Sequence, residues 1–282
     1  MRIGIIGAGK VGVTLGKYLA DAGEEVLGFY SRTRESAAAA ADFTQTTVYQ
    51  NLEDLVKASD TLFLTTPDGE ISKVWDCIAE YDLTDKLICH FSGSLSSNVF
   101  SGIEQTRACG VSIHPMYAFS GKFTSYRQFH TAWLVMEGQE TALKPMRTLF
   151  EDRLGHRVLV IQATDKVKYH AAAAMASNYM IALYETALTL LGDCGFSYKD
   201  SMALLQPLVQ NNVAAMLEKG PTEALTGPIE RGDTETVQKH LEALSGNAAE
   251  TIYRELGQIL VSLAKRKHPE WDDTAMKNCL HQ

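Results

Sequence analysis

The chain has 282 residues, of which 45% are hydrophobic and 21% are charged, a composition typical of a globular protein with one or two domains. Its formal net charge of −8 argues against a general affinity for nucleic acid or for an anionic membrane surface. The opening apolar run is too short for a signal peptide, and no run approaches the roughly 20 apolar residues of a membrane span. Together with five scattered cysteines that form no CxxC pair, this predicts a cytoplasmic protein with reduced thiols.

Short apolar runs alternate with helical patterns up to about residue 160. This alternation is typical of a mostly parallel sheet covered by helices. The predicted strands are Arg2–Ile6, Glu25–Tyr30, Thr61–Thr65, Lys86–Phe91, Gly110–His114, Trp133–Glu137 and Val158–Gln162, and the predicted helices between the early strands are Val11–Ala22, Asn51–Ala58 and Glu70–Tyr81. We expect Pro115 to end the fifth of these strands.

The pattern becomes helical after Asp165. An alanine-rich run without proline, ending at Gly192 and Gly195, predicts one helix of about seven turns. Further helices are predicted at Tyr198–Lys219, Thr234–Leu244 and Asn247–Ala264. We therefore predict an α/β Rossmann domain over residues 1–162, followed by an all-α domain over residues 163–282. The apolar long helix suggests a homodimer formed through the helical domain.

A glycine pattern, Gly7-x-Gly9-x-x-Gly12, follows the first predicted strand and opens a helix. In this context the first glycine allows a tight turn, the second lets the backbone approach a pyrophosphate, and the third lets helix and strand pack closely. The free N–H groups at the helix start would then bind the phosphates. The alternative is a structural turn without a ligand.

The end of the second predicted strand distinguishes NAD from NADP. An NAD enzyme usually carries an acidic residue there, whereas this chain has Ser31 and Arg32. A hydroxyl and a guanidinium can bind a 2′-phosphate, so we predict NADP(H), with a solvated basic turn as the alternative. The predicted cofactor-binding residues are Gly7, Ala8, Gly9, Lys10, Val11, Gly12, Ser31, Arg32, Thr66 and Pro67. Asp68, which follows them, is expected to be a structural N-cap.

Candidate catalytic residues lie beyond the carboxyl ends of strands and on the long helix. Ser92 and His114 each follow or end a predicted strand, where ligands of open α/β sheets bind. At 100° per residue, Lys166, His170 and Ser177 share one face of the long helix, and Asn178 flanks them.

A bound substrate with a carboxylate and a carbonyl would explain such a polar stripe, since unpaired buried polar groups are costly. Exposure of these first helical turns, or a structural role for His114, is the alternative. Arg231 or Lys168 could bind a carboxylate as well. The histidine spacing gives no support for a metal site.

Five segments together resemble a known family, the Rossmann-like proteins with a DUF2520 C-terminal domain. They are "GIIGAGKVGVTLG", "HFSGSLS", "IHPMYAF", "KYHAAAAMASNY" and "LTGPIERGDTETVQKHL". The resemblance implies a Rossmann domain followed by an all-α domain of the 6-phosphogluconate-dehydrogenase-like type. It also implies cofactor contacts at the glycine loop, Ser31 and Arg32, and a substrate pocket near Ser92, His114, His170 and Asn178.

The function that the resemblance implies is NADP-dependent oxidation or reduction. Some bacterial members of the family are associated with ketopantoate reduction in pantothenate synthesis. We therefore expect an NADPH-dependent reductase of a small 2-oxo acid, with ketopantoate (2-dehydropantoate) as the first substrate to test. His114 or His170 would donate the proton, Asn178 and Ser92 would orient the substrate, and Lys166, Lys168 or Arg231 would bind its carboxylate. The alternatives are a cyclic-imine reductase of the pyrroline-5-carboxylate type and a non-catalytic NADP(H)-binding sensor.

Overall fold

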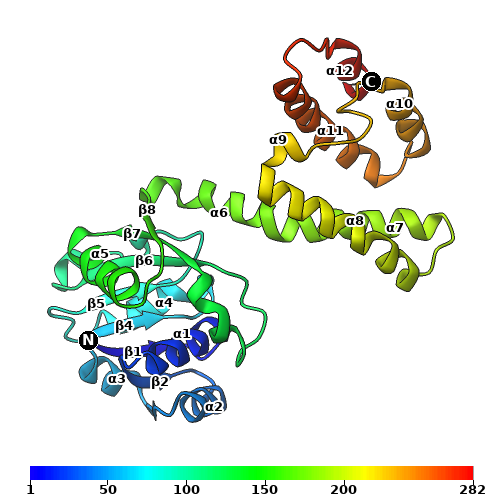
Figure 1. Ribbon diagram of the computed structural model, residues 1–282. Coiled ribbons are helices and arrows are strands. Elements are labelled where there is room, and N and C mark those ends of the chain that lie inside the picture. The colour runs from blue at the N-terminus through cyan, green and yellow to red at the C-terminus, as the bar shows by residue number, and fades with distance from the viewer. Residues whose placement is uncertain (282) are drawn as a thin grey trace. The chain divides into compact units, whose positions relative to one another are not determined.

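A computed structural model of the chain describes residues 1–281. By their contacts these residues divide into two units, Met1–Ser177 and the residues from Asn178 onward (Figure 1). The helix that begins at Lys166 is shared between the two units, which are described separately below.

The first unit is built on one eight-stranded sheet with the order β3-β2-β1-β4-β5-β6-β7-β8. Its neighbouring strands are parallel except for the antiparallel pair β6 and β7, so the predicted mostly parallel α/β domain is confirmed. The strands are β1 (Arg2–Ile6), β2 (Glu25–Tyr30), β3 (Thr47–Val48), β4 (Thr61–Leu64), β5 (Leu87–His90), β6 (Cys109–Met116), β7 (Trp133–Gly138) and β8 (Val158–Val160). Only the two-residue β3 has no counterpart among the predicted strands.

Strand β6 is longer than expected, because the prediction that Pro115 ends it is wrong. The strand continues to Met116, and Pro115 pairs with Leu134 of β7. Pairing with β5 ends at Ser112, so beyond that residue β6 has a partner on one side only. A residue that lacks an N–H group is tolerated at such an edge.

Helices cover both faces of the sheet and bury two apolar clusters. One cluster is buried under α1 (Lys10–Asp21), α2 (Arg34–Thr44) and α5 (Glu140–Arg147). The other is buried under α3 (Leu52–Ala58) and α4 (Asp68–Ile78), with Trp75 at its centre. Burial on both faces explains why the strands of this sheet are nearly continuous apolar runs.

The long helix predicted after Asp165 is present but changes its winding midway. Helix α6 (Lys166–Ala174) leads into a π-helical segment (Met175–Tyr179) and then into α7 (Met180–Asp193). A π-helical turn holds more residues than an α-helical turn, so side chains after it are rotated from the face that a uniform 100° step predicts.

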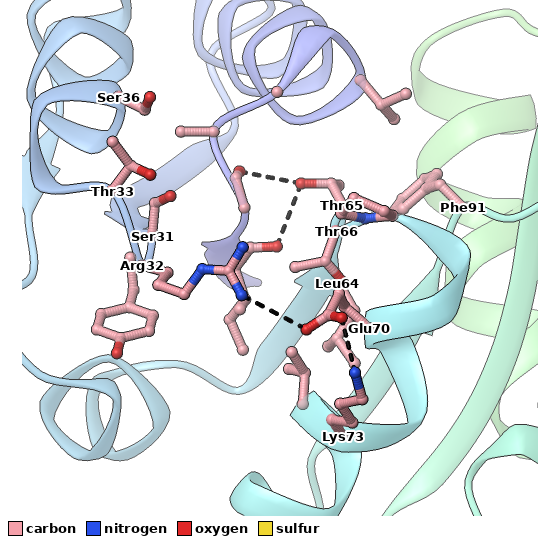
Figure 2. Close-up of a pocket in the computed structure, with 18 of the residues that line it drawn as sticks. Ser31, Arg32, Thr33, Ser36, Leu64, Thr65, Thr66, Glu70, Lys73 and Phe91 are labelled. Atoms are coloured by element: carbon pink, nitrogen blue, oxygen red, sulfur yellow. Dashed lines mark hydrogen bonds and ion pairs between the residues drawn. The ribbon is translucent and has the colours of Figure 1, made fainter.

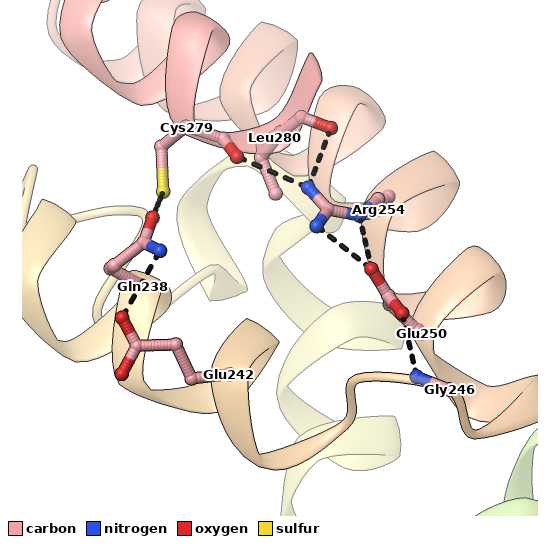
Figure 3. A network of polar contacts seen from close by, with 7 residues as sticks. All are labelled: Gln238, Glu242, Gly246, Glu250, Arg254, Cys279 and Leu280. Atoms are coloured by element: carbon pink, nitrogen blue, oxygen red, sulfur yellow. Dashed lines mark hydrogen bonds and ion pairs between the residues drawn. The ribbon is translucent and has the colours of Figure 1, made fainter. Parts of the chain in front are cut away.

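The second unit is helical, as predicted. After α7 it holds α8 (Tyr198–Lys219), α9 (Pro221–Ala224), α10 (Thr234–Ala243), α11 (Ala248–Lys267) and α12 (Thr274–His281). Its apolar core is small and includes Ile229, Val237, Leu241, Val261 and Met276. Figure 3 shows how polar groups add to it: the guanidinium of Arg254 binds the Glu250 carboxylate and donates to the carbonyl oxygens of Cys279 and Leu280, which lie in the last turn of α12. Within residues 1–281, no helix has the length and apolarity that a bilayer crossing requires.

Candidate active site

A cavity of about 720 Å³ lies at the carboxyl ends of β1, β2 and β4 in the first unit. The predicted cofactor-binding residues line it, with the exception of Gly12, and Ser92 lines it too. Open α/β sheets bind ligands at this edge, because the helices that follow the neighbouring strands β1 and β4 cover opposite faces of the sheet and leave a crevice between them.

The glycine loop has the backbone geometry that a dinucleotide requires. Gly7 adopts a φ of +111°, and a Cβ there would lie 2.9 Å from the backbone of Thr65. Gly9 precedes α1 and has no atom within 4 Å of the place that a Cβ would take, so a ligand can approach the backbone. Gly12 packs instead: a Cβ there would lie 2.5 Å from the Gly7 carbonyl oxygen. Each glycine thus has the backbone geometry that the motif requires, while cofactor binding at this loop stays a prediction.

One end of the cavity is rich in hydroxyls and charges (Figure 2). Ser31, Thr33 and Ser36 contribute hydroxyl groups. Glu70 of α4 accepts from Lys73 at 2.8 Å and pairs with Arg32 at 3.7 Å. The ion pair with Lys73, and more weakly Arg32, lowers the pKa of the Glu70 carboxyl. The Arg32 side chain is 90% exposed, so its pairing with Glu70 is weak and exchangeable.

Ser92 lies at the other end of the cavity, just beyond β5, in a hydrogen-bonded loop. Its hydroxyl donates to the Asp68 carboxylate at 2.7 Å, and the Ser94 hydroxyl donates to the same oxygen at 3.0 Å. Asp68 was expected to cap a helix, but that expectation is wrong: Pro67 holds the N-cap position, Asp68 is the first residue of α4, and its carboxylate binds the two serine hydroxyls. The carboxylate holds the serine loop against the cavity instead.

His90, the last residue of β5, contacts two residues of the same serine loop. Its side chain is fully buried, its Nδ1 accepts from the Ser92 N–H at 3.3 Å, and its Nε2 lies 3.2 Å from the Ser96 carbonyl oxygen. Accepting at Nδ1 leaves Nε2 as the donor, which fits a neutral ring. Burial, with a smaller contribution from the positive charge of Lys166, lowers the pKa of His90 to about 4, and the Ser96 contact opposes this shift.

Lys166 is the most deeply buried charged group of this region, with 1% of its surface exposed. Its ammonium donates to the Ser92 carbonyl oxygen at 3.0 Å and to the Ser112 hydroxyl at 2.8 Å. Burial lowers the pKa of Lys166 to about 8, although Glu137 and Asp68 favour its charged form. The buried ammonium therefore lies directly behind Ser92. Lys168, two residues further along the same helix, is exposed.

His114, Tyr169 and His170 form an imidazole–phenol group next to Gly93. His114 Nδ1 and the Tyr169 hydroxyl are 2.8 Å apart, and the two imidazole rings lie 5.7 Å apart, edge to face. A Cβ on Gly93 would lie 2.4 Å from His170 Nδ1 and 2.8 Å from His114 Nε2. Burial, followed by the charges of Lys166 and His170, lowers the pKa of His114 to about 4, so the ring is neutral at pH 7. Within the first unit, the structure thus brings four predicted residues together: Ser92, His114, Lys166 and His170.

Three other predicted residues are not part of this group within the first unit. Ser177 is exposed in the π-helical segment, where its hydroxyl donates to the Ala173 carbonyl oxygen. Asn178 and Arg231 belong to the second unit, and their side chains are exposed in it. No group of three or more metal-ligand side chains occurs in the described part of the chain.

Sequence reasoning missed several residues of this site: His90, Gly93, Tyr169 and the role of Asp68. A histidine inside the buried run "LICH" is a detectable signal for His90, since polar side chains in buried strands need partners. Tyr169 precedes His170 directly, but nothing in the sequence shows that its hydroxyl reaches the end of β6.

Comparisons with known proteins agree with this architecture. Residues 1–115 match a Rossmann-like domain, and residues 132–259 match DUF2520, a domain of unknown function. No curated protein matches the chain.

Similar solved structures include a protein from Thermotoga maritima, which is 23% identical with a TM-score of 0.73, over 94% of this chain and 99% of that one. A pyrroline-5-carboxylate reductase from Coxiella burnetii is 17% identical with a TM-score of 0.61, over 94% and 98% of the two chains. An imine reductase from Myxococcus stipitatus in complex with NADP+ is 18% identical with a TM-score of 0.61, over the full length of both. At these identities the likeness establishes the fold. The two matched domains confirm the resemblance noted from the sequence: this chain is a Rossmann-like protein with a DUF2520 domain.

Proposed function

We propose that this protein is an NADPH-dependent reductase that acts on the C=O or C=N bond of a small anionic substrate. The observation that carries the proposal is the continuity of one cavity. It runs from the glycine loop and the hydroxyl-rich end at Ser31 and Arg32 to Ser92. Lys166 binds the Ser92 carbonyl oxygen, and His114 lies next to the following residue, Gly93. Similarly folded proteins include reductases of carbon–nitrogen double bonds, one of them in complex with NADP+.

The residues present fit the cofactor. The open approach to Gly9 and the N-terminus of α1 suit a pyrophosphate, and the hydroxyls with Arg32 suit a 2′-phosphate better than the 2′-hydroxyl of NADH. NADPH supplies the hydride when it is bound. The protein supplies orientation and charge.

We assign a distinct role to each residue of the inner cluster, which consists of Ser92, His114, Lys166 and His170. Ser92, held by Asp68, orients the substrate at the cavity wall. Lys166 places a positive charge behind Ser92, where it stabilises negative charge that develops on the substrate. His114 is neutral at pH 7, so it acts as a hydrogen-bonding group, and we assign the proton transfer to His170. Asn178 as an orienting residue, and Lys168 or Arg231 as carboxylate-binding residues, stay predictions.

The test combines binding and turnover. Purified protein is titrated with NADPH and NADH by fluorescence, and NADPH oxidation is then followed with ketopantoate and with pyrroline-5-carboxylate. Tight NADPH binding with ketopantoate-dependent oxidation supports the 2-oxo acid reductase, and oxidation with pyrroline-5-carboxylate alone supports the imine reductase instead. Binding without turnover of either substrate favours the NADP(H) sensor. A preference for NADH contradicts the assignment of Ser31 and Arg32.

A homodimer is the second part of the proposal. Helices α7 and α8 expose many large apolar side chains within the second unit, such as Ile181 at 69% and Leu217 at 77% exposed. Monomeric proteins rarely expose so many apolar side chains on neighbouring helices. Sedimentation should give a dimer for the wild type and a monomer for Ile181→Asp combined with Leu217→Asp. A wild-type monomer at micromolar concentration contradicts this part.

A further inference from the structure

A histidine's chemistry depends on which ring nitrogen carries the proton, and the surroundings of His114 restrict this choice. Because its pKa is lowered to about 4, the ring is neutral at pH 7 and carries a single N–H. Burial raises the pKa of Tyr169 to about 12, so its phenol keeps its proton at neutral pH. The 2.8 Å hydrogen bond between His114 Nδ1 and the Tyr169 hydroxyl can therefore run in either direction.

A buried atom without a hydrogen-bond partner, near His114 Nε2, favours one direction of this hydrogen bond. This atom is Nδ1 of His170. It and His114 Nε2 both lie within 2.8 Å of the place that a Cβ on Gly93 would take. When His170 carries its own proton on Nε2, a lone pair on His114 Nε2 would face a second lone pair there. The two nitrogens are not hydrogen-bonded to each other, so a proton on His114 Nε2 would instead be a donor for a ligand atom that enters beside Gly93. Buried polar atoms nearly always have a hydrogen-bond partner, so a ligand atom at this point would complete the site.

We propose that Tyr169 is a positioning residue that donates to His114 Nδ1 and thereby holds His114 in the Nε2–H tautomer. This inference rests on the proposed function for its catalytic meaning, because an Nε2–H donor next to Ser92 and Gly93 is what an accepting carbonyl oxygen needs as negative charge builds on it. The Tyr169 hydroxyl contacts His114 Nδ1, and the Tyr169 ring also lies 6.0 Å from the Lys166 ammonium, a contact that Tyr169→Phe keeps.

The chain offers a matched control. In the helical unit, His240 Nδ1 and the Tyr253 hydroxyl are also 2.8 Å apart, and their rings are likewise edge to face. Tyr253→Phe therefore removes the same type of contact at a position outside the cavity. Tyr169→Phe and Tyr253→Phe keep their aromatic rings, so both variants are expected to fold.

The first readout needs no substrate. Nitrogen-15 NMR of the imidazole rings at pH 7 should show His114 with a protonated Nε2 in the wild type and in Tyr253→Phe. Tyr169→Phe should show a mixture of tautomers. A proton on Nδ1 in the wild type, or an unchanged tautomer in Tyr169→Phe, overturns the proposal whether or not a substrate has been found.

The second readout separates positioning from binding. With any substrate that the wild type reduces, Tyr169→Phe should lower kcat about 10- to 100-fold, less than the loss of a proton-transfer group itself. The KM for NADPH should stay within about threefold, and Tyr253→Phe should match the wild type in both constants. Equal losses in kcat and in NADPH binding would indicate a merely structural role. If the wild type reduces no substrate, the proposed function fails, while the NMR result still decides the tautomer.

Discussion

The two ends of the cavity are built by different physical means. At the outer end, Arg32 is almost fully exposed, and its pairing with Glu70 at 3.7 Å can exchange with solvent. At the inner end, Lys166 is buried and held at hydrogen-bond distance by Ser92 and Ser112. Exposed charges interact weakly and are screened by salt, whereas buried charges interact strongly and are costly when left unpaired. Substitutions should therefore have large effects at the inner end and small ones at the outer end.

The largest effect is expected for Lys166→Met, which keeps the volume of the side chain but removes its charge. The Ser92 carbonyl oxygen and the Ser112 hydroxyl lose their donor, and the site loses its buried positive charge. Turnover, measured as NADPH oxidation, should fall by a factor on the order of 100 or more, while NADPH affinity changes less than about threefold.

The control for this variant is Lys57→Met, because Lys57 pairs with Glu53 on the surface of α3, outside the cavity. It should retain wild-type turnover. If Lys166→Met keeps half of the wild-type rate, the buried ammonium has no part in the reaction, and the contrast between the two ends loses its basis.

The next largest effect is expected for Gly93→Ala. A single methyl group would lie 2.4 Å from His170 Nδ1 and 2.8 Å from His114 Nε2, so at least one ring must move. We expect kcat to fall about 10- to 100-fold with NADPH binding preserved, because a small misplacement of reacting groups is costly. Gly192→Ala is the matched control, since nothing lies within 4 Å of a Cβ there. Wild-type turnover in Gly93→Ala would show that the imidazole positions do not matter.

The same contrast explains what the sequence could predict. The outer end depends on local features, such as the glycine loop after β1, and Gly7, Ser31 and Arg32 indeed line the cavity together. The inner end depends on contacts between segments far apart in the chain. The hydrogen bond between Tyr169 and His114 joins residues 55 positions apart, and that between Lys166 and Ser92 joins residues 74 apart. Residue spacing along one element cannot reveal such pairs.

Regular periodicity also had a limit within the long helix. The prediction that Ser177 shares a face with Lys166 and His170 assumed a uniform 100° step. The π-helical segment Met175–Tyr179 interrupts that step. Alanine-rich sequence gives no local signal for this change of winding, and only the packed structure reveals it.

A smaller effect, on stability, follows from the neutral histidines of the inner end. The pKa values of His90 and His114 are lowered to about 4 by burial and by Lys166, with Asp68 acting in the opposite direction. Between pH 6.5 and pH 4 the unfolded chain therefore binds protons that the folded protein does not, so stability falls as pH falls. Each histidine should contribute roughly 1–2 kcal/mol to the loss between pH 7 and pH 5.

Urea unfolding at the two pH values measures this loss. His90→Gln should reduce the difference in unfolding free energy between pH 7 and pH 5, whatever it does to stability at either value alone. His130, which is exposed, provides the control variant His130→Gln, and its pH difference should equal that of the wild type. An undiminished pH difference in His90→Gln would mean that His90 titrates in the folded protein as it does in the unfolded chain.

The smallest effect is expected at the outer end, for Glu70→Gln. The Glu70 carboxylate competes with a 2′-phosphate for Arg32 and Lys73, and its removal should strengthen NADPH binding roughly two- to fivefold, the range that exposed ion pairs allow. NADH affinity should not change, because NADH carries no 2′-phosphate. The gain in NADPH affinity should shrink as salt is raised, because salt screens the attraction of Arg32 and Lys73 for the phosphate. Glu53→Gln, in the surface pair on α3, should change neither affinity. A tenfold or greater loss of NADPH affinity in Glu70→Gln would instead mean that Glu70 orients Arg32 toward the phosphate. The outer end would then be preorganised in the same way as the inner one, since a weak pair that merely competes for a cation cannot produce a loss of that size.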